Sequence, residues 1–257
     1  MPSAALLRLE IERALADRFP AALTPAPRTI REVAETGIAA VDELLEGGLP
    51  VGAISELIGP ESSGRTSLAL AFLARRTAEG RVGAWVDAGD AFDPESAAAN
   101  GVTLRQLLWV RCRDREASAK WKAQAKPWTR LDQALRATDL LLQAGGFAAI
   151  VLDLGTMARE HGNRIQAATW FRFRQAAERA RCSLVVLGKA AYAQSSAALV
   201  LECARQQTRT AGGTVLRGFE YTVQRKRERG APIEIGTRKP PVSIRAARAV
   251  WEAEMRA

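Results

Sequence analysis

Histidine and cysteine are scarce in this sequence, which contains one histidine, His161, and three cysteines, Cys112, Cys182 and Cys203. The cysteines are odd in number, far apart and set in apolar segments, so we expect buried thiols. His161 lies in a polar stretch that is typical of a surface loop. The composition therefore disfavours a disulfide scaffold and a cysteine- or histidine-based metal site.

Long apolar runs are also missing. No apolar stretch reaches the roughly 18 to 20 residues that a membrane span requires, and the N-terminus lacks the basic, apolar and small-residue regions of a secretion signal. No repeat, low-complexity segment or linker divides the 257 residues, of which 47% are hydrophobic. We therefore expect a cytoplasmic protein, with no membrane contact, whose core forms one large domain.

Lysine is rare as well, with 6 lysines against 31 arginines, and the net charge of +9 is unevenly placed. Residues 1–158 hold 18 basic and 20 acidic side chains, whereas residues 159–257 hold 19 basic and 8 acidic. A basic half of this kind favours a polyanionic partner, with nucleic acid first. A basic surface that serves solubility, or a drift of composition toward arginine, is the alternative, but drift does not explain the asymmetry.

The N-terminal segment has a helical pattern of its own. Leu6, Leu9 and Leu15 recur among charges at spacings typical of an amphipathic helix, and "TPAPRT" then predicts an extended connector. We expect residues 1–33 to form this helix and linker, and residues 34–257 to form the core.

The core alternates strand and helix patterns. Apolar runs that predict strands are "GAWVDA", "LLWVRC", "AAIVLDL", "SLVVLG" and "AALVLEC", and "WTRLDQALRATDLLLQAGG" predicts one of the helices between them. Such alternation is typical of an α/β fold with a parallel sheet covered on both faces. Residues 214–237 predict an antiparallel hairpin, and residues 242–257 predict a terminal helix anchored by Val250 and Trp251.

The stretch "GPESSGRTS", residues 59–67, differs by one residue from the phosphate-binding loop Gly-x-x-x-x-Gly-Lys-Ser/Thr. A predicted strand precedes it and a predicted helix follows, so backbone N–H groups and a helix N-terminus can surround phosphate oxygens. Thr66 offers a hydroxyl for magnesium. The loop residues expected to bind nucleotide are Gly59, Pro60, Glu61, Ser62, Ser63, Gly64, Arg65, Thr66 and Ser67.

A second acid is expected from a later strand. In "FAAIVLDLG" an apolar run leads into Asp153, and the carboxyl end of a parallel strand faces the same crevice as the loop. We therefore expect Thr66 and Asp153 to hold a magnesium ion beside the nucleotide.

Two segments carry a resemblance to a known family. "TGIAAVDELLEGGLPVGAISELIGPESSGRTSLAL" and "WVDAGDAFDPESAAANGV" resemble the bacterial recombinase RecA, specifically over residues 36–103 and collinearly to about residue 226. The resemblance implies a RecA-like P-loop core, a mostly parallel sheet flanked by helices with an antiparallel C-terminal extension. It also implies ATP and Mg²⁺ as cofactors, binding being favoured over hydrolysis.

Three positions depart from that family. Arg65 replaces the loop lysine and, being planar and forked, cannot place a compact charge at the same point. Gly89 stands where the family has a catalytic glutamate; the adjacent Asp90 is shorter and points elsewhere. Lys189 replaces a glutamine that senses the γ-phosphate in that family. Its side chain either adds a second positive charge to the nucleotide site or fills this site when no nucleotide is bound. Together the changes argue against efficient hydrolysis, and phosphate binding survives them.

The resemblance also implies DNA-binding loops. The first corresponds to residues 155–170, where Arg159 and Arg164 suit phosphate contacts. The basic run adds Arg225, Lys226 and Arg227, with the two arginines on one face of a strand and the lysine opposite. Solvated charge is the alternative for both. The second loop is shortened to "AAYAQSSA", which disfavours strand exchange; its tyrosine either stacks on a base or packs.

Short, core-only relatives with degraded nucleotide motifs resemble the ImuA type of accessory protein in translesion mutagenesis. This implies a nucleoid-associated protein that contacts an ImuB-like Y-family polymerase homologue, RecA or a second copy, and single- or double-stranded DNA. One alternative is a DNA-dependent ATPase in which Arg65 and Asp90 replace the usual pair. Another is a regulator that binds RecA filaments through residues 4–30. The sequence of this segment is equally compatible with a helix that folds back on its own core.

Overall fold

The computed structural model describes residues 32–113, 129–211, 215–228 and 246–252, all within a unit that spans residues 32–257. The expected N-terminal helix thus lies outside the described residues. The helices are α2 (Ala39–Leu44), α3 (Arg65–Ala78), α4 (Pro94–Ala99), α5 (Arg130–Ala144), α6 (Arg159–Asn163) and α7 (Ala167–Ala180). The strands are β1 (Val33–Ala34), β2 (Leu49–Pro50), β3 (Ile54–Ile58), β4 (Gly83–Asp87), β5 (Leu107–Arg111), β6 (Ala149–Asp153), β7 (Ser183–Gly188), β8 (Ala197–Ala211), β9 (Val215–Glu228) and β10 (Ala246–Glu252).

Within the described residues, eight strands form the main sheet, in the order β10-β9-β8-β3-β7-β6-β4-β5. Strands β8, β3, β7, β6, β4 and β5 run parallel, and β9 and β10 add an antiparallel end. The short strands β1 and β2 pair separately. The expected fold class, a mostly parallel sheet flanked by helices with an antiparallel C-terminal extension, is confirmed.

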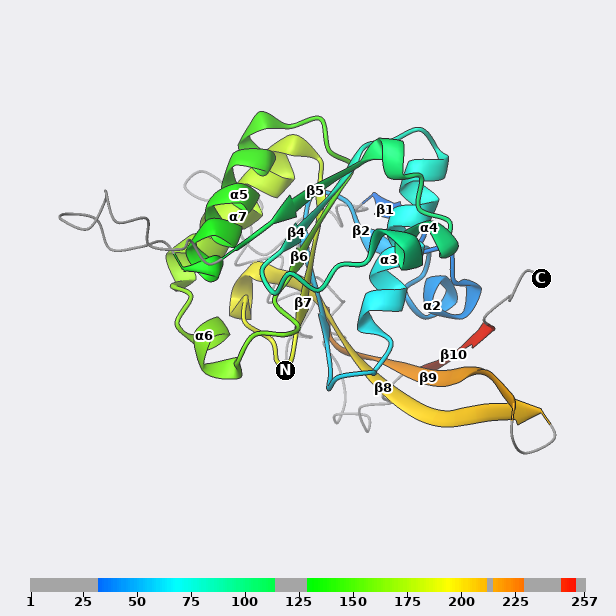
Figure 1. Ribbon diagram of the computed structural model, residues 1–257. Helices are drawn as coiled ribbons and strands as arrows, with labels where there is room; N and C mark the ends of the chain where they lie inside the picture. Colours follow the sequence, from blue (N-terminus) through cyan, green and yellow to red (C-terminus); the bar gives the residue numbers. More distant parts are fainter. Residues whose placement is uncertain (1–31, 114–128, 212–214, 229–245, 253–257) are drawn as a thin grey trace, which may run out of the picture. The chain divides into compact units, whose positions relative to one another are not determined.

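Helices cover both faces of the parallel part (Figure 1). α2 and α3 pack on one face around Phe72 and Trp85, and α5 and α7 pack on the other around Phe173. Because successive side chains of a buried strand point to opposite faces, the continuous apolar runs supply both cores. The three cysteines are free and buried, as expected. None of the helices in the described part of the chain is long and apolar enough to cross a membrane.

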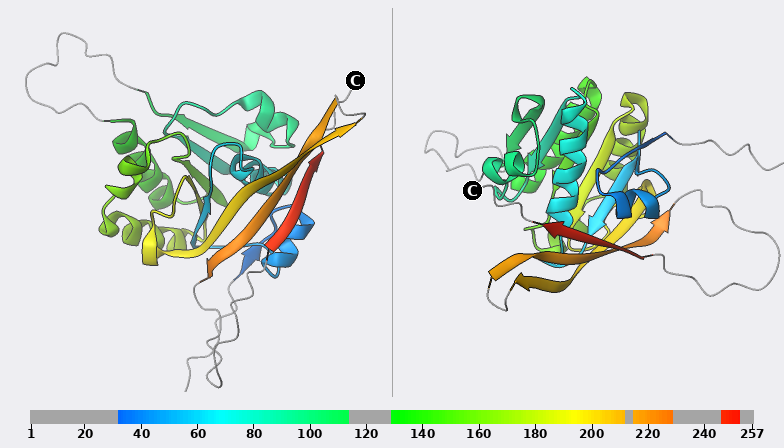
Figure 2. Two further views of the ribbon diagram at one scale, coloured as in Figure 1. Left: turned by 90° about the horizontal axis from the view of Figure 1, so that it is seen from below. Right: turned by 90° about the vertical axis from the view of Figure 1, so that its right-hand side faces the viewer.

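The C-terminal region differs from expectation. Residues 246–252, predicted as part of a terminal helix, form β10, which pairs antiparallel with β9 over its full length. The alanine-rich segment favours helix locally, but the open edge of β9 offers a complete ladder of backbone hydrogen bonds, and tertiary pairing overrides propensity. β9 itself pairs with β8 upstream (Figure 2). The second half of the hairpin predicted over residues 214–237 lies outside the described residues.

Candidate nucleotide-binding site

The glycine-rich loop connects β3 to α3 at the carboxyl edge of the sheet. β3 lies between β7 and β8, so the loop sits at the centre of the sheet. Gly64 ends the loop with φ 88°, and a β-carbon there would lie 2.8 Å from the Tyr221 ring of β9. Only glycine tolerates both this backbone conformation and this close approach. The local pattern strand, glycine-rich loop and helix is therefore present as the sequence predicts.

A pocket of about 330 Å³ lies beside this loop. It brings together loop residues and residues from the ends of β4 and β6, because these parallel strands finish at the same edge. Its lining residues are Glu61, Ser62, Arg65, Thr66, Leu70, Trp85, Ala91, Phe92, Asp93, Ser96, Asp153, Gly155 and Thr156. Arg65, Thr66 and Asp153, which are distant in sequence, thus line one pocket.

Arg65 points into the protein rather than to solvent. Its side chain is buried, and Nη1 donates a hydrogen bond to the carbonyl oxygen of Gly188 at the end of β7. A β-carbon at Gly155 would lie 3.2 Å from Arg65 Nη2 and 3.0 Å from Asp153 Oδ1, so the two charged groups flank the same point. Burial lowers the pKa of the Arg65 guanidinium, although Asp153 opposes the shift.

Asp153 ends β6 as a buried carboxyl. Its Oδ1 accepts a hydrogen bond from the Gly155 N–H at 2.8 Å. Burial raises the pKa of Asp153 to about 6, although this hydrogen bond and the charge of Arg65 lower it. The charge of Asp87, which lies opposite Asp153 in the β4–β6 register, raises the pKa further. Within the described ranges, no cluster of three or more histidine, cysteine or acidic residues could hold a metal ion.

Lys189 reaches the loop from the end of β7. Its Nζ lies 3.0 Å from Glu61 Oε1, and this hydrogen bond lowers the pKa of Glu61. Both side chains are partly or largely exposed, so the pair contributes little stability. Lys189 therefore lies at the loop, where the resemblance locates the γ-phosphate sensor.

Gly89 lies where the resemblance assigns a catalytic glutamate, and the side chain of Thr156 must move before a larger residue fits there. A β-carbon at this position would lie 1.8 Å from Thr156 Oγ1. The neighbouring Asp90 has φ 56° and accepts hydrogen bonds from Arg111 Nε and Nη2 at 2.7 and 3.1 Å. These bonds lower the pKa of Asp90. Asp90 is thus engaged on the surface by Arg111.

Two buried residues of β4 near the pocket were not predicted from the sequence. Asp87 accepts hydrogen bonds from the backbone N–H groups of Ala91 and Phe92, at 3.0 and 2.9 Å, and so holds the loop that follows the strand. Trp85 lines the pocket, and its indole N–H has no hydrogen-bond partner among the described residues. In the sequence, both residues belong to the apolar run "GAWVDA", which predicts a buried strand and gives no sign of a site.

The two candidate DNA-binding groups lie on different elements. Arg159 begins α6 and Arg164 follows it, and both are exposed, as is His161. Tyr192 is buried against Gly162 of α6 and Gly188, where a β-carbon would meet its ring at 2.4 and 2.7 Å. Tyr192 is therefore a packing residue and is not available to stack on a base.

The basic run on β9 is irregular. The β8–β9 register pairs Leu201 with Arg225 and Val200 with Arg227, so Lys226 is an extra residue in a bulge, and regular alternation of faces does not hold there. Lys226 pairs with Glu202 at 2.6 Å, and Arg227 donates a hydrogen bond to the carbonyl oxygen of Gln194.

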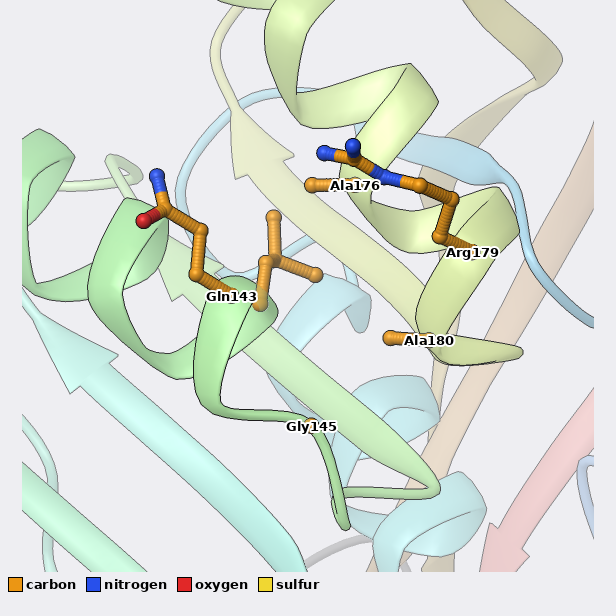
Figure 3. Close-up of a pocket in the computed structure, with 6 residues that line it drawn as sticks. Gln143, Gly145, Ala176, Arg179 and Ala180 are labelled. Atoms are coloured by element: carbon orange, nitrogen blue, oxygen red, sulfur yellow. The ribbon is translucent and has the colours of Figure 1, made fainter.

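A second pocket, of about 520 Å³, lies between the C-terminal ends of α5 and α7 (Figure 3). Gln143 comes from α5, Arg179 from α7, and Gly145 from the segment that leads into β6. Because α5 ends where β6 begins, this pocket lies at the amino edge of the sheet, away from the loop. None of the predicted site residues lines it.

A glycine-rich loop after the central strand β3, with an acid at the end of β6 two strands away, is the layout of a P-loop core of the recombinase class. Residues 10–158 match the model of the RecA N-terminal domain. The chain belongs to the RecA family.

Individual relatives agree. The chain is 30% identical to Protein RecA of Thermus thermophilus over 232 residues, which cover 85% of this chain and 62% of that protein. It is 37% identical to Protein RecA of Crocosphaera subtropica over 131 residues, 51% of this chain and 33% of that protein. The matches thus span less than two thirds of these relatives. The crystal structure of the RadB recombinase is similar in fold, with a TM-score of 0.54, 19% identity, and coverage of 78% of this chain and 92% of that one.

Proposed function

We propose that this protein is a non-hydrolysing or weakly hydrolysing RecA-like accessory protein of the ImuA type. It acts in DNA-damage-induced translesion synthesis through protein contacts and DNA contacts. The observation that carries the proposal is the site at Gly89, where Thr156 occupies the space that a catalytic side chain needs. Arg65, turned toward Gly188, supports the same conclusion. The loop backbone and the pocket are retained, so residues 59–67 hold the phosphates of a bound nucleotide.

Turnover of ATP in the presence of single-stranded DNA tests this proposal. We expect the wild-type rate to equal that of Asp153→Ala, because no side chain orients the attacking water. Gly89→Glu combined with Arg65→Lys should also stay at background, whereas adding Thr156→Gly makes room for the glutamate and should raise the rate about tenfold or more. A DNA-stimulated wild-type rate that disappears in Asp153→Ala would instead favour a DNA-dependent ATPase.

We propose that α6 contributes the first contacts to DNA. Arg159 and Arg164 are exposed there, whereas Lys226 and Arg227 are engaged by Glu202 and Gln194 and must first exchange these partners. Arg225 precedes them on β9, opposite Leu201 of β8.

Salt titration of DNA binding checks this assignment. Arg159→Ala and Arg164→Ala should each reduce the slope of log K against log salt by about 1 and weaken binding to all sequences alike. Arg179→Ala, at the amino edge of the sheet, is the matched control. Binding that does not weaken with rising salt would contradict the assignment.

The expected protein partners are an ImuB-like Y-family polymerase homologue, RecA or a second copy. We propose that residues 1–33 dock on the partner. The short connection between β7 and β8 supports an interaction role over strand exchange, because little chain is left for a second DNA loop. Capture of the purified polymerase homologue and of RecA filaments, with and without residues 1–30, separates these partners. Unchanged capture after the deletion would remove the docking role of the segment. Normal damage-induced mutagenesis in cells that lack the protein would contradict the translesion role.

A further inference from the structure

The pocket beside the loop already contains a cation of the protein itself. The Arg65 guanidinium and the Asp153 carboxyl flank Gly155, and the guanidinium is anchored by the Gly188 carbonyl oxygen. A magnesium ion held by Thr66 and Asp153 would therefore lie close to a second positive charge in a buried setting, where like charges repel strongly. The residues present do not fit the metal that the fold family implies.

We propose that Arg65 takes the place of the magnesium ion, so that this pocket binds a polyphosphate, such as a nucleoside triphosphate, without a divalent cation. The guanidinium is permanently charged and presents a planar fork of N–H donors that suits phosphate oxygens. It also compensates the negative charge of Asp153, as a metal ion bound at this position would. A phosphate group thus meets a fixed cation and the backbone of the loop together.

An unpartnered donor of a residue in the pocket wall supports an anionic, oxygen-rich ligand. The indole N–H of Trp85, a fully buried residue that lines the pocket, has no hydrogen-bond partner among the described residues. A buried donor without a partner is costly, so an acceptor such as a phosphate or ribose oxygen satisfies it.

Calorimetric titration with ATP and with inorganic tripolyphosphate, in magnesium and in EDTA, tests the proposal on the full chain. The wild-type Kd should change less than about fivefold between the two buffers, because the arginine remains in either. Arg65→Lys, which restores a compact charge, should bind at least about tenfold more tightly with magnesium than without. Arg65→Ala should weaken binding about tenfold or more in both buffers, and Arg179→Ala should leave it unchanged.

A larger loss of wild-type affinity in EDTA, or no binding of either probe by the folded protein, would overturn the proposal. Arg65→Lys keeps the test decisive if Arg65→Ala does not fold, since its metal response is compared with that of the wild type. The inference rests on the proposed non-hydrolytic role, but different results would contradict the metal replacement and the proposed function. Metal-dependent binding without turnover refutes only the metal replacement, and DNA-stimulated turnover refutes the proposed function.

Discussion

Asp153→Asn is expected to stabilise the protein by about 3 kcal/mol at pH 8 and to have little effect at pH 4. Burial raises the pKa of Asp153 from 3.8 to about 6, so the folded state favours the protonated carboxyl. The stability that this group contributes is therefore fully present below pH 3.8 and is lost as the pH rises through 6. Asparagine removes the buried charge and keeps an oxygen that accepts the Gly155 N–H. Urea unfolding of both proteins at the two pH values measures the difference.

Asp90→Asn is a matched control of opposite sign. The hydrogen bonds from Arg111 lower the pKa of Asp90, so its contribution is present above its ordinary pKa and is lost as the pH falls. Asp90→Asn should therefore lower stability at pH 8, where Asp153→Asn raises it. An effect of Asp153→Asn that is equal at pH 4 and pH 8 would contradict the assignment of a buried, ionised carboxylate.

Glu56→Ala is expected to destabilise the protein by about 3 kcal/mol, whereas Glu56→Gln should cost less than about 1 kcal/mol. Glu56 is buried in β3, and its Oε1 accepts the backbone N–H groups of Tyr192 and Ala193 at 2.5 and 2.9 Å. Alanine leaves both buried N–H groups unpaired and opens a cavity, while glutamine retains the accepting oxygen. Chemical denaturation measures the two losses, and hydrogen exchange at the amides of Tyr192 and Ala193 locates them.

The pH dependence separates the charge of Glu56 from its hydrogen bonds. Burial raises the pKa of Glu56, so the buried carboxylate destabilises the fold most at high pH. The stability of Glu56→Gln relative to the wild type should therefore be highest at high pH. Exchange at Tyr192 and Ala193 should rise in Glu56→Ala alone. Equal destabilisation by alanine and glutamine would show that the accepting oxygen does not hold the segment after β7.

The strands and helices of the core could be predicted because their signals are local. The apolar run before Asp153 and the glycine-rich loop after β3 each read correctly from short windows of sequence. The helix α4 was not predicted; its start depends on Asp93, whose side chain accepts the backbone N–H groups of Glu95 and Ser96. The terminal helix was predicted wrongly, because the free edge of β9 cannot be seen in the sequence of β10.

The sequence by itself determined that a loop of the phosphate-binding type follows a strand, that Asp153 ends a later strand, and that lysine and glutamate are missing from positions 65 and 89. These facts depend on residue type and on the periods of strand and helix, which are local properties. Only the tertiary structure decided that Arg65 turns to Gly188 beside Asp153, that Thr156 covers Gly89, and that Tyr192 is packed. Each of these depends on contacts between residues far apart in the chain, which form only when the parallel strands bring their carboxyl ends to one edge.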